Sequence, residues 1–116
     1  MDRKKELKEQ YKMMKPDMGI FMIKSNFKNK CYIETAQNLR GKINSTEFKL
    51  NFSNHPNREL QKDWNEYGKD SFTIEILEKL EYDKDETKTD YSEELEILEM
   101  EWKEKLSKEG MEFYSK

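Results

Sequence analysis

The chain of 116 residues is predicted to fold as one α+β domain with a small antiparallel or mixed sheet. Three observations predict this class. Segments with apolar residues at helical spacing alternate with short apolar or alternating segments, which are typical of strands. Aromatic residues make up 12% of the chain, so a small core can form although 41% of residues are charged. The length leaves room for one core only.

The chain begins with residues at helical spacing. Leu7, Tyr11 and Met14 lie at i, i+4 and i+7, which predicts an amphipathic helix over residues 2–14. Pro16 ends this helix, because proline lacks the backbone N–H and clashes with the preceding turn.

A strand hairpin is expected next. The apolar run 19–23 is short and bounded by turn residues, which predicts a buried strand. Residues 25–30 contain two asparagines and suit a hairpin loop, and residues 31–33 form the second strand.

Two helices follow the hairpin. Thr35 can cap a helix that runs to about Asn51, and Asn57 can cap a shorter helix that Gly68 closes. Each has apolar residues on one face. These residues are Leu39, Ile43 and Leu50 in the first helix, and Leu60, Trp64 and Tyr67 in the second.

One more strand and a long helix complete the domain. Alternation of apolar and polar residues over 72–76 predicts a half-buried strand. Residues 81–90 form an acidic linker without apolar periodicity. Asp90 and Glu93 then resemble a capping box, which opens a last helix that ends near Ser107.

Composition excludes several classes of protein. The longest apolar run is 20–23, far short of the roughly twenty residues that cross a membrane. The basic start leads into more charge, so no secretory signal is expected. Cys31 is the only cysteine, which excludes an internal disulfide and suits a reducing cytoplasm. We therefore expect a cytoplasmic protein with no membrane partner.

The net charge of −3 conceals an asymmetry between the two halves. Residues 1–62 hold 14 Lys/Arg against 7 Asp/Glu, whereas residues 63–116 hold 8 against 18. Nucleic-acid binding depends on a local basic patch, so the acidic average does not exclude it. The alternative is that both halves simply carry solvated charge.

Two residues are candidates on chemical grounds. His55 is the one histidine and precedes a proline in a loop, where a solvated polar role is the alternative. Glu99 falls about 20° beyond the apolar face of the last helix. A carboxylate there loses solvation unless a cation, a donor or a metal such as Mg²⁺ meets it. The alternative is an edge glutamate whose carboxylate extends to water or pairs with a lysine.

The motifs Gly19-Ile20-Phe21 and Tyr32-Ile33-Glu34, about ten residues apart, resemble the paired signature of the GIY-YIG endonuclease superfamily. The agreement continues through Asn38-Leu39 and through 60–68 and 72–78. It ends with Glu99, three residues before Trp102.

The resemblance spans roughly residues 18–106 and implies a three-stranded antiparallel sheet flanked by helices. The expected organisation is an extra N-terminal helix in 1–17, the nuclease-like domain in 18–110 and a C-terminal tail in 111–116. Members of the superfamily cut DNA phosphodiesters with one divalent metal, so Mg or Mn is the expected cofactor.

Site residues carry over by position. Tyr32 stands at the position of one signature tyrosine. Lys42 lies in the register of an arginine that stabilises the developing phosphate charge, and His55 matches a histidine that is frequent in the family. These three are the catalytic candidates. Phe21 stands at the position of the other signature tyrosine, which is lost here. Glu99 matches the metal ligand.

The departures from the family pattern predict impaired catalysis. Phe21 has no hydroxyl, and Lys42 lacks the planar fork of arginine. Arg40 is not its substitute, because two residues turn the side chain by about 200°. Glu34 adds bulk and negative charge where the motif has glycine.

Three hypotheses remain. The first is a domain with a degraded active site, weak or no cleavage and non-specific nucleic-acid binding. The second is a slow Mg- or Mn-dependent DNA endonuclease. The third is a protein-interaction module, with a protein partner or a homodimer formed through the N-terminal helix. The nucleic-acid-binding candidates are Lys24, Lys28, Lys30, Arg40, Lys42 and Lys49.

Overall fold

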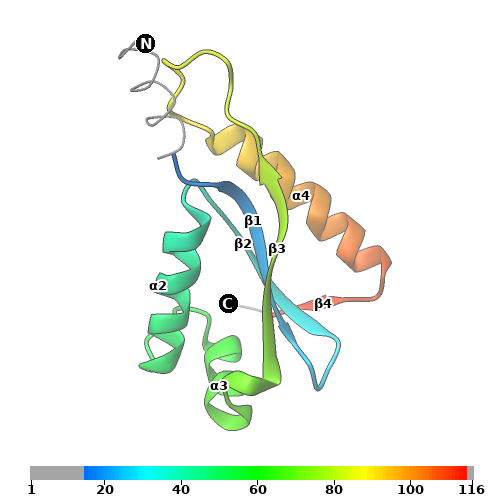
Figure 1. Cartoon of the computed structure of the whole chain (residues 1–116). Coiled ribbons are helices and arrows are strands. Elements are labelled where there is room, and N and C mark those ends of the chain that lie inside the picture. The colour runs from blue at the N-terminus through cyan, green and yellow to red at the C-terminus, as the bar shows by residue number, and fades with distance from the viewer. Residues whose placement is uncertain (1–14, 115–116) are drawn as a thin grey trace.

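The computed structural model describes residues 15–114. A mixed four-stranded sheet separates helices α2 and α3 from helix α4 (Figure 1). No helix in this part of the chain is long and apolar enough to cross a membrane. The elements are β1 (Met18–Ser25), β2 (Lys30–Ala36), α2 (Leu39–Asn51), α3 (Arg58–Tyr67), the 3-10 turn η1 (Lys69–Ser71), β3 (Phe72–Leu80), α4 (Ser92–Lys108) and β4 (Glu112–Phe113).

The strand order is β3-β1-β2-β4, and β1 pairs antiparallel with both of its neighbours. The three expected strands are present and antiparallel, but the sheet has a fourth strand that the prediction lacked. The fourth strand, β4, pairs in parallel with Lys30 and Cys31 of β2. A strand of two residues is too short to leave a periodic pattern in the sequence.

Part of the expected C-terminal tail belongs to the folded domain. Besides the residues of β4, Tyr114 is buried and packs with the core between the sheet and helices α2 and α3. Residues 112–114, which fall in the predicted tail, thus take part in the sheet and the core, and the domain bounds stay a prediction. The helix predicted over residues 2–14 lies outside the described part of the chain.

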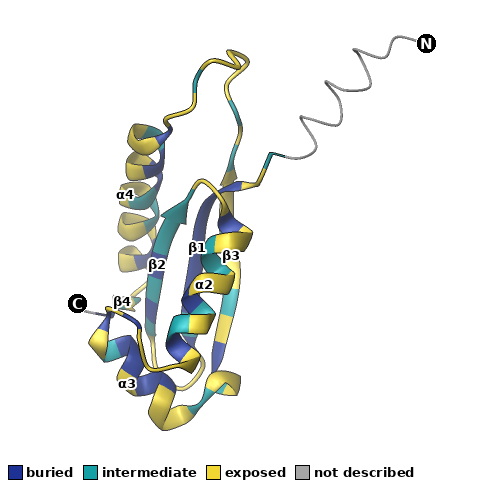
Figure 2. Cartoon of the chain, turned by 90° about the vertical axis from the view of Figure 1, so that its left-hand side faces the viewer, coloured by how far each residue is buried: buried dark blue, intermediate teal, exposed yellow. Residues whose placement is uncertain are grey.

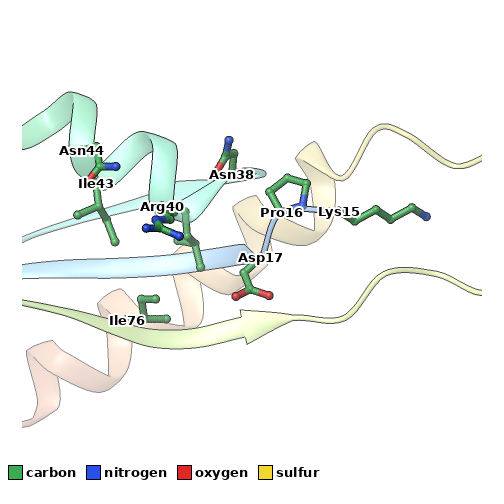
Figure 3. A pocket seen from close by; sticks show the side chains of 9 residues that line it. Lys15, Pro16, Asp17, Asn38, Arg40, Ile43, Asn44 and Ile76 are labelled. Carbon is green, nitrogen blue, oxygen red and sulfur yellow. The ribbon is translucent and has the colours of Figure 1, made fainter. Parts of the chain in front are cut away.

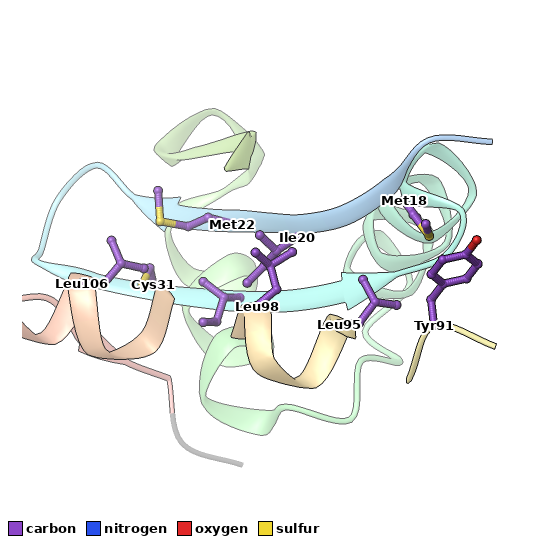
Figure 4. Close-up of a cluster of buried hydrophobic side chains, with 9 residues drawn as sticks. Met18, Ile20, Met22, Cys31, Tyr91, Leu95, Leu98 and Leu106 are labelled. Atoms are coloured by element: carbon purple, nitrogen blue, oxygen red, sulfur yellow. The ribbon is translucent and has the colours of Figure 1, made fainter. Parts of the chain in front are cut away.

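Strand β1 is buried on both faces and supplies two cores (Figure 2). Met18, Ile20 and Met22 pack against α4 (Figure 4). Phe21 and Ile23 alternate with them and pack against α2 and α3. The sheet is thus a partition between two layers, as period-two alternation requires.

Helix α2 begins later than predicted. Its cap is Asn38, whose side-chain oxygen accepts a hydrogen bond of 3.0 Å from the Gly41 N–H. Thr35, the predicted cap, lies in β2 opposite Ile20, and pairing continues to Ala36. Sheet pairing therefore outweighs the local capping preference of threonine.

The other helix ends are mostly as predicted. Asn57 caps α3 by accepting from the Leu60 N–H at 3.1 Å, and Gly68 ends the helix with a φ of 85°. Before α4, the Asp90 carboxylate accepts from the N–H of Ser92. The predicted capping box with Glu93 is therefore absent, although the helix spans nearly the predicted residues.

The predicted alternation along β3 breaks at a bulge. Phe21 pairs with Ile76 and Ile20 pairs with Glu78, so Leu77 is an extra residue on β3. Ile76 stays on the face of Phe21 and is exposed, and Leu77 packs with the α4 core. After the bulge, Glu78 and Leu80 pair with Ile20 and Met18 and so turn to the α4 side. The pattern over 72–76 predicted the strand but not this change of face.

Gly19 gives the fold a direct test. A Cβ atom at this position would lie 2.1 Å from the Glu78 carbonyl oxygen, whereas at Gly68 it would meet nothing within 4 Å. We expect Gly19→Ala to lower the free energy of unfolding by about 3 kcal/mol through overpacking. Gly68→Ala, the matched control with a φ of 85°, should lose only about 1 kcal/mol. Equal losses in urea unfolding would contradict this account of the β1–β3 contact.

Candidate active site

Glu34 connects two of the candidate catalytic residues. The Tyr32 hydroxyl donates a hydrogen bond of 2.8 Å to Glu34 Oε2. Lys42 Nζ lies 3.2 Å from Glu34 Oε1 in an ion pair. Tyr32 and Glu34 are two residues apart on β2 and so share the face toward α2 and α3, where Lys42 on α2 meets them. The Glu34 carboxylate is therefore the hydrogen-bond acceptor of the Tyr32 phenol and the ion-pair partner of the Lys42 ammonium.

Phe21 lies directly beside this arrangement. It pairs with Glu34 across the β1–β2 ladder, and its ring is fully buried. The ring offers no donor or acceptor to the site. Phe21 therefore lies opposite Glu34 in the sheet and adds no polar atom to the site.

The pKa of Tyr32 lies well above its ordinary value. Burial is the main cause, and the hydrogen bond to Glu34 and the charges of Glu34 and Glu99 add to it. A phenol next to two carboxylates is costly to ionise. Tyr32 is therefore a protonated donor at neutral pH.

His55 is a buried member of the same cluster and not a solvated loop residue. Its ring packs edge-on against Tyr32, with ring centroids 5.2 Å apart. Its Nδ1 accepts a 3.0 Å hydrogen bond from the Asn57 N–H, so the neutral ring carries its hydrogen on Nε2. Gln61 holds the loop by accepting from the His55 N–H and donating to the Leu50 carbonyl.

Burial lowers the pKa of His55, and its surroundings modulate that shift. The charge of Glu34 opposes the shift, whereas the positive charges of Lys49 and Lys42 reinforce it. His55 is thus a neutral imidazole close to Glu34, Lys42 and Lys49.

Glu99 reaches the site from the opposite layer. Together with Tyr32 it lines a cavity of about 280 Å³ at the edge of β2. Glu99 is half-buried, and within residues 15–114 it forms no hydrogen bond or ion pair. The lysine pairing that was the alternative for Glu99 is therefore not found among these residues. The other lining residues are Cys31, Ile33, Asn57, Lys103, Phe113 and Tyr114.

Glu99 is the one carboxylate that lines this cavity, which it shares with the cation Lys103, so a metal there would depend on Glu99. Glu99 offers carboxylate oxygens, which Mg²⁺ prefers. Cys31 is buried, which raises the pKa of its thiol to about 11, and sulfur is not a ligand that Mg²⁺ prefers. Among the described residues, no group of three or more Asp, Glu, His or Cys side chains is placed so that it could hold a metal ion. A metal here would have Glu99 as its one acidic ligand.

The basic candidates do not form one surface. Lys28 pairs with Asp63 at 2.5 Å and Lys30 with Glu59 at 2.6 Å, in addition to the Lys42–Glu34 pair. By its place on β1, Lys24 lies on the side of the sheet that faces α4.

Arg40 lines a different cavity, of about 530 Å³, with Ile43 and Ile76 (Figure 3). None of the four site residues Tyr32, Lys42, His55 and Glu99 lines that cavity.

Sequence reasoning missed the residues that support the site. The buried Tyr114 hydroxyl donates to Asp63 Oδ2 at 2.8 Å, and the Asn57 side chain donates to the Tyr114 carbonyl. Gln61 could have been found from the sequence, because it follows the apolar Leu60 on α3 and is itself buried, which requires hydrogen-bond partners for its amide. Tyr114 could not be found in this way, because the residues around it show no helical or strand periodicity.

Comparisons with solved structures identify the class of this fold. The chain resembles the catalytic domain of homing endonuclease I-TevI, with a TM-score of 0.65 and 24% identity over 85% of this chain and 99% of that one. A second solved structure, a glutamate-to-alanine mutant of the catalytic domain of intron endonuclease I-TevI, is 30% identical to this chain and superposes with a TM-score of 0.52. That match covers 60% of this chain and 70% of the other. No protein-family model and no curated protein matches.

The fold is thus that of an endonuclease catalytic domain. The chain belongs to the GIY-YIG superfamily, which confirms the resemblance seen in its motifs.

The position of His55 predicts its titration. The chain has one histidine, so its ring signal in proton NMR is unambiguous. We expect a midpoint below the ordinary value of 6.5, because burial disfavours the charged ring. Glu34→Gln should lower the midpoint further, and Lys49→Gln should raise it. A wild-type midpoint at or above 6.5, or no response to Glu34→Gln, would contradict the site geometry.

The same shift has a consequence for stability. Because the folded pKa is depressed, the unfolded chain takes up this proton first as the pH falls below 6.5. The contribution of His55 to stability is therefore complete above 6.5 and is lost as the pH drops toward the folded pKa.

Proposed function

We propose that this chain is a GIY-YIG nuclease-like domain with a degraded active site, which binds nucleic acid and cleaves phosphodiesters weakly or not at all. The observation that carries the proposal is the placement of Glu34. Its two oxygens hold the Tyr32 hydroxyl and the Lys42 ammonium, the groups that would serve water and phosphate.

The acid–base and charge-stabilising parts of the site are both weakened. Phe21 has no hydroxyl, and the Tyr32 phenol is tied to a carboxylate that disfavours its ionisation. The Lys42 ammonium is partly exposed but paired with Glu34, whose negative charge offsets its attraction for a phosphate. Loss of one preorganised charge-stabilising group typically costs about two to three orders of magnitude in rate.

A nucleic-acid partner is supported by the cations of α2. Arg40, Lys42 and Lys49 lie on this helix, whose only carboxylate is Glu47. Arg40 and Lys49 form no ion pair among residues 15–114. Phosphate contacts by such side chains are independent of sequence and release counterions. We narrow the six basic candidates to Lys42 and Lys49, which lie on one side of the helix, because Arg40 points about 200° away from Lys42.

A slow Mg- or Mn-dependent endonuclease is the second candidate, and one observation favours it. Glu99 is half-buried beside Tyr32 in the cavity and has no partner among the described residues. A divalent ion held there would polarise a phosphate oxygen. Tyr32 and His55 would still have to activate the water, although Tyr32 is hydrogen-bonded to Glu34 and His55 is buried.

The remaining expectations stay predictions. A protein partner or homodimer formed through residues 1–17 involves a segment largely outside the described residues. A cytoplasmic location is likewise a proposal from composition.

Cleavage assays test the degraded site. We expect no robust nicking of plasmid or oligonucleotide with Mg²⁺ or Mn²⁺. The triple change Phe21→Tyr, Glu34→Gly and Lys42→Arg should raise any residual activity by about tenfold or more, because it restores a phenol, a bare backbone and a planar donor. Robust metal-dependent nicking by the unmodified protein, abolished by Glu99→Ala, would support the second candidate instead.

Binding assays test the basic helix. We expect weak binding whose logarithmic salt dependence has a slope of about −2, since two cations, Lys42 and Lys49, contact phosphate. Lys49→Gln should reduce the magnitude of this slope by about 1. Lys24→Gln, the matched control on the far side of the sheet, should leave it unchanged. If both variants change the slope equally, binding follows general charge and not the surface of α2.

A further inference from the structure

Two phenylalanine rings project from the end of α2. Phe48 is 62% exposed and Phe52 is 68% exposed. The two rings contact each other, with centroids 4.6 Å apart and planes at 39°. We call this pair the aromatic platform. A partner that covers these rings removes apolar surface from water, which favours binding.

The aromatic platform borders the lysines of the site. At about 100° per residue, Lys42 and Lys49 lie within about 20° of each other around the helix axis. Phe52 is about 60° from Lys49, and Phe48 is about 100° from it. Glu47 points about 160° away from Lys49. Ring faces and positive charges therefore share one side of the helix, and the carboxylate lies on the other.

The backbone under the platform is firmly held. The Phe52 N–H donates to the Phe48 carbonyl at 3.1 Å, and the Asn54 N–H donates to the Lys49 carbonyl at 2.7 Å. Ser53 between them adopts a left-handed φ of 57° and closes the helix end. A preorganised surface loses little conformational entropy when it binds.

A second exposed apolar pair differs in its chemistry. Ile97 and Met100 on α4 are 56% and 66% exposed. They have no aromatic face, and they alternate along the helix with Glu96, Glu99 and Glu101. These charges repel phosphate, so this pair does not fit a nucleic acid.

We propose that the aromatic platform stacks unpaired bases of a single-stranded nucleic acid whose phosphates contact Lys42 and Lys49. Every base has a π-face, so stacking on Phe48 and Phe52 requires no particular sequence. Bases inside a duplex are already stacked and are inaccessible to the platform. The inference rests on the proposed nucleic-acid binding and specifies its substrate class as single strands or unpaired segments.

Fluorescence anisotropy with a labelled oligothymidylate of about twenty nucleotides, longer than one typical binding site, tests this at low salt. The double variant Phe48→Ala/Phe52→Ala should bind it about tenfold or more weakly than wild type. Binding of a duplex of equal length should change less than about twofold. The control Ile97→Ala/Met100→Ala removes an equally exposed apolar pair and should leave both affinities unchanged. Circular dichroism verifies that each variant is folded.

Phe52→Trp gives a direct signal from the platform. This variant keeps an aromatic face, so it should retain the affinity of the wild type. Its added tryptophan fluorescence, measured against the wild-type background of Trp64 and Trp102, should be quenched when the oligothymidylate binds. Unquenched emission at saturation would overturn the proposal.

The other outcomes separate this inference from the proposed function. If wild type binds both nucleic acids and the double alanine variant binds them equally well, only the platform proposal fails. If wild type binds neither, the proposed nucleic-acid binding fails as well. If wild type self-associates in sedimentation while the double alanine variant is monomeric with unchanged binding, the platform is an interface between copies of this chain.

Discussion

The sheet is a partition, and this constraint determines where a site can form. Strand β1 is buried on both faces, so α2 and α3 pack in one layer and α4 packs in the other. Tyr32 belongs to the first layer and Glu99 to the second. They line one cavity because β4 pairs with only the first two residues of β2 and leaves the edge beyond Cys31 unpaired.

Within that geometry, Glu34 determines the chemistry of the α2 side. Its carboxylate is the acceptor for Tyr32 and the counter-ion for Lys42, and its charge acts on His55. A glycine at this position would leave the phenol and the ammonium available to a phosphate. The same residue therefore explains why the groups that would serve catalysis are occupied although the fold is that of a nuclease.

Sequence patterns predicted the elements with strong periodicity and missed those set by pairing. The buried strand around Phe21 and the Asn57-capped helix are confirmed, because apolar spacing and cap chemistry are local signals. Thr35 was mistaken for a cap because its preference was overruled by strand pairing. Tyr32 and Lys42 came from family positions, and His55 and Glu99 also from their chemistry. The spacing of Tyr32 and Glu34 places them on one face of a strand, whereas the ion pair of Glu34 with Lys42 joins two elements and could not be read from spacing.

The central claim is that Glu34 competes with phosphate for Lys42. A double-mutant cycle with Glu34→Gln and Lys42→Gln, read out as affinity for a single-stranded oligonucleotide at low salt, tests it most directly. The account predicts that Glu34→Gln strengthens binding by about threefold when Lys42 is present, as release from an exposed ion pair allows. It predicts no gain when Lys42 is replaced. An equal gain in both backgrounds would show that Glu34 acts only through general charge and would contradict the account.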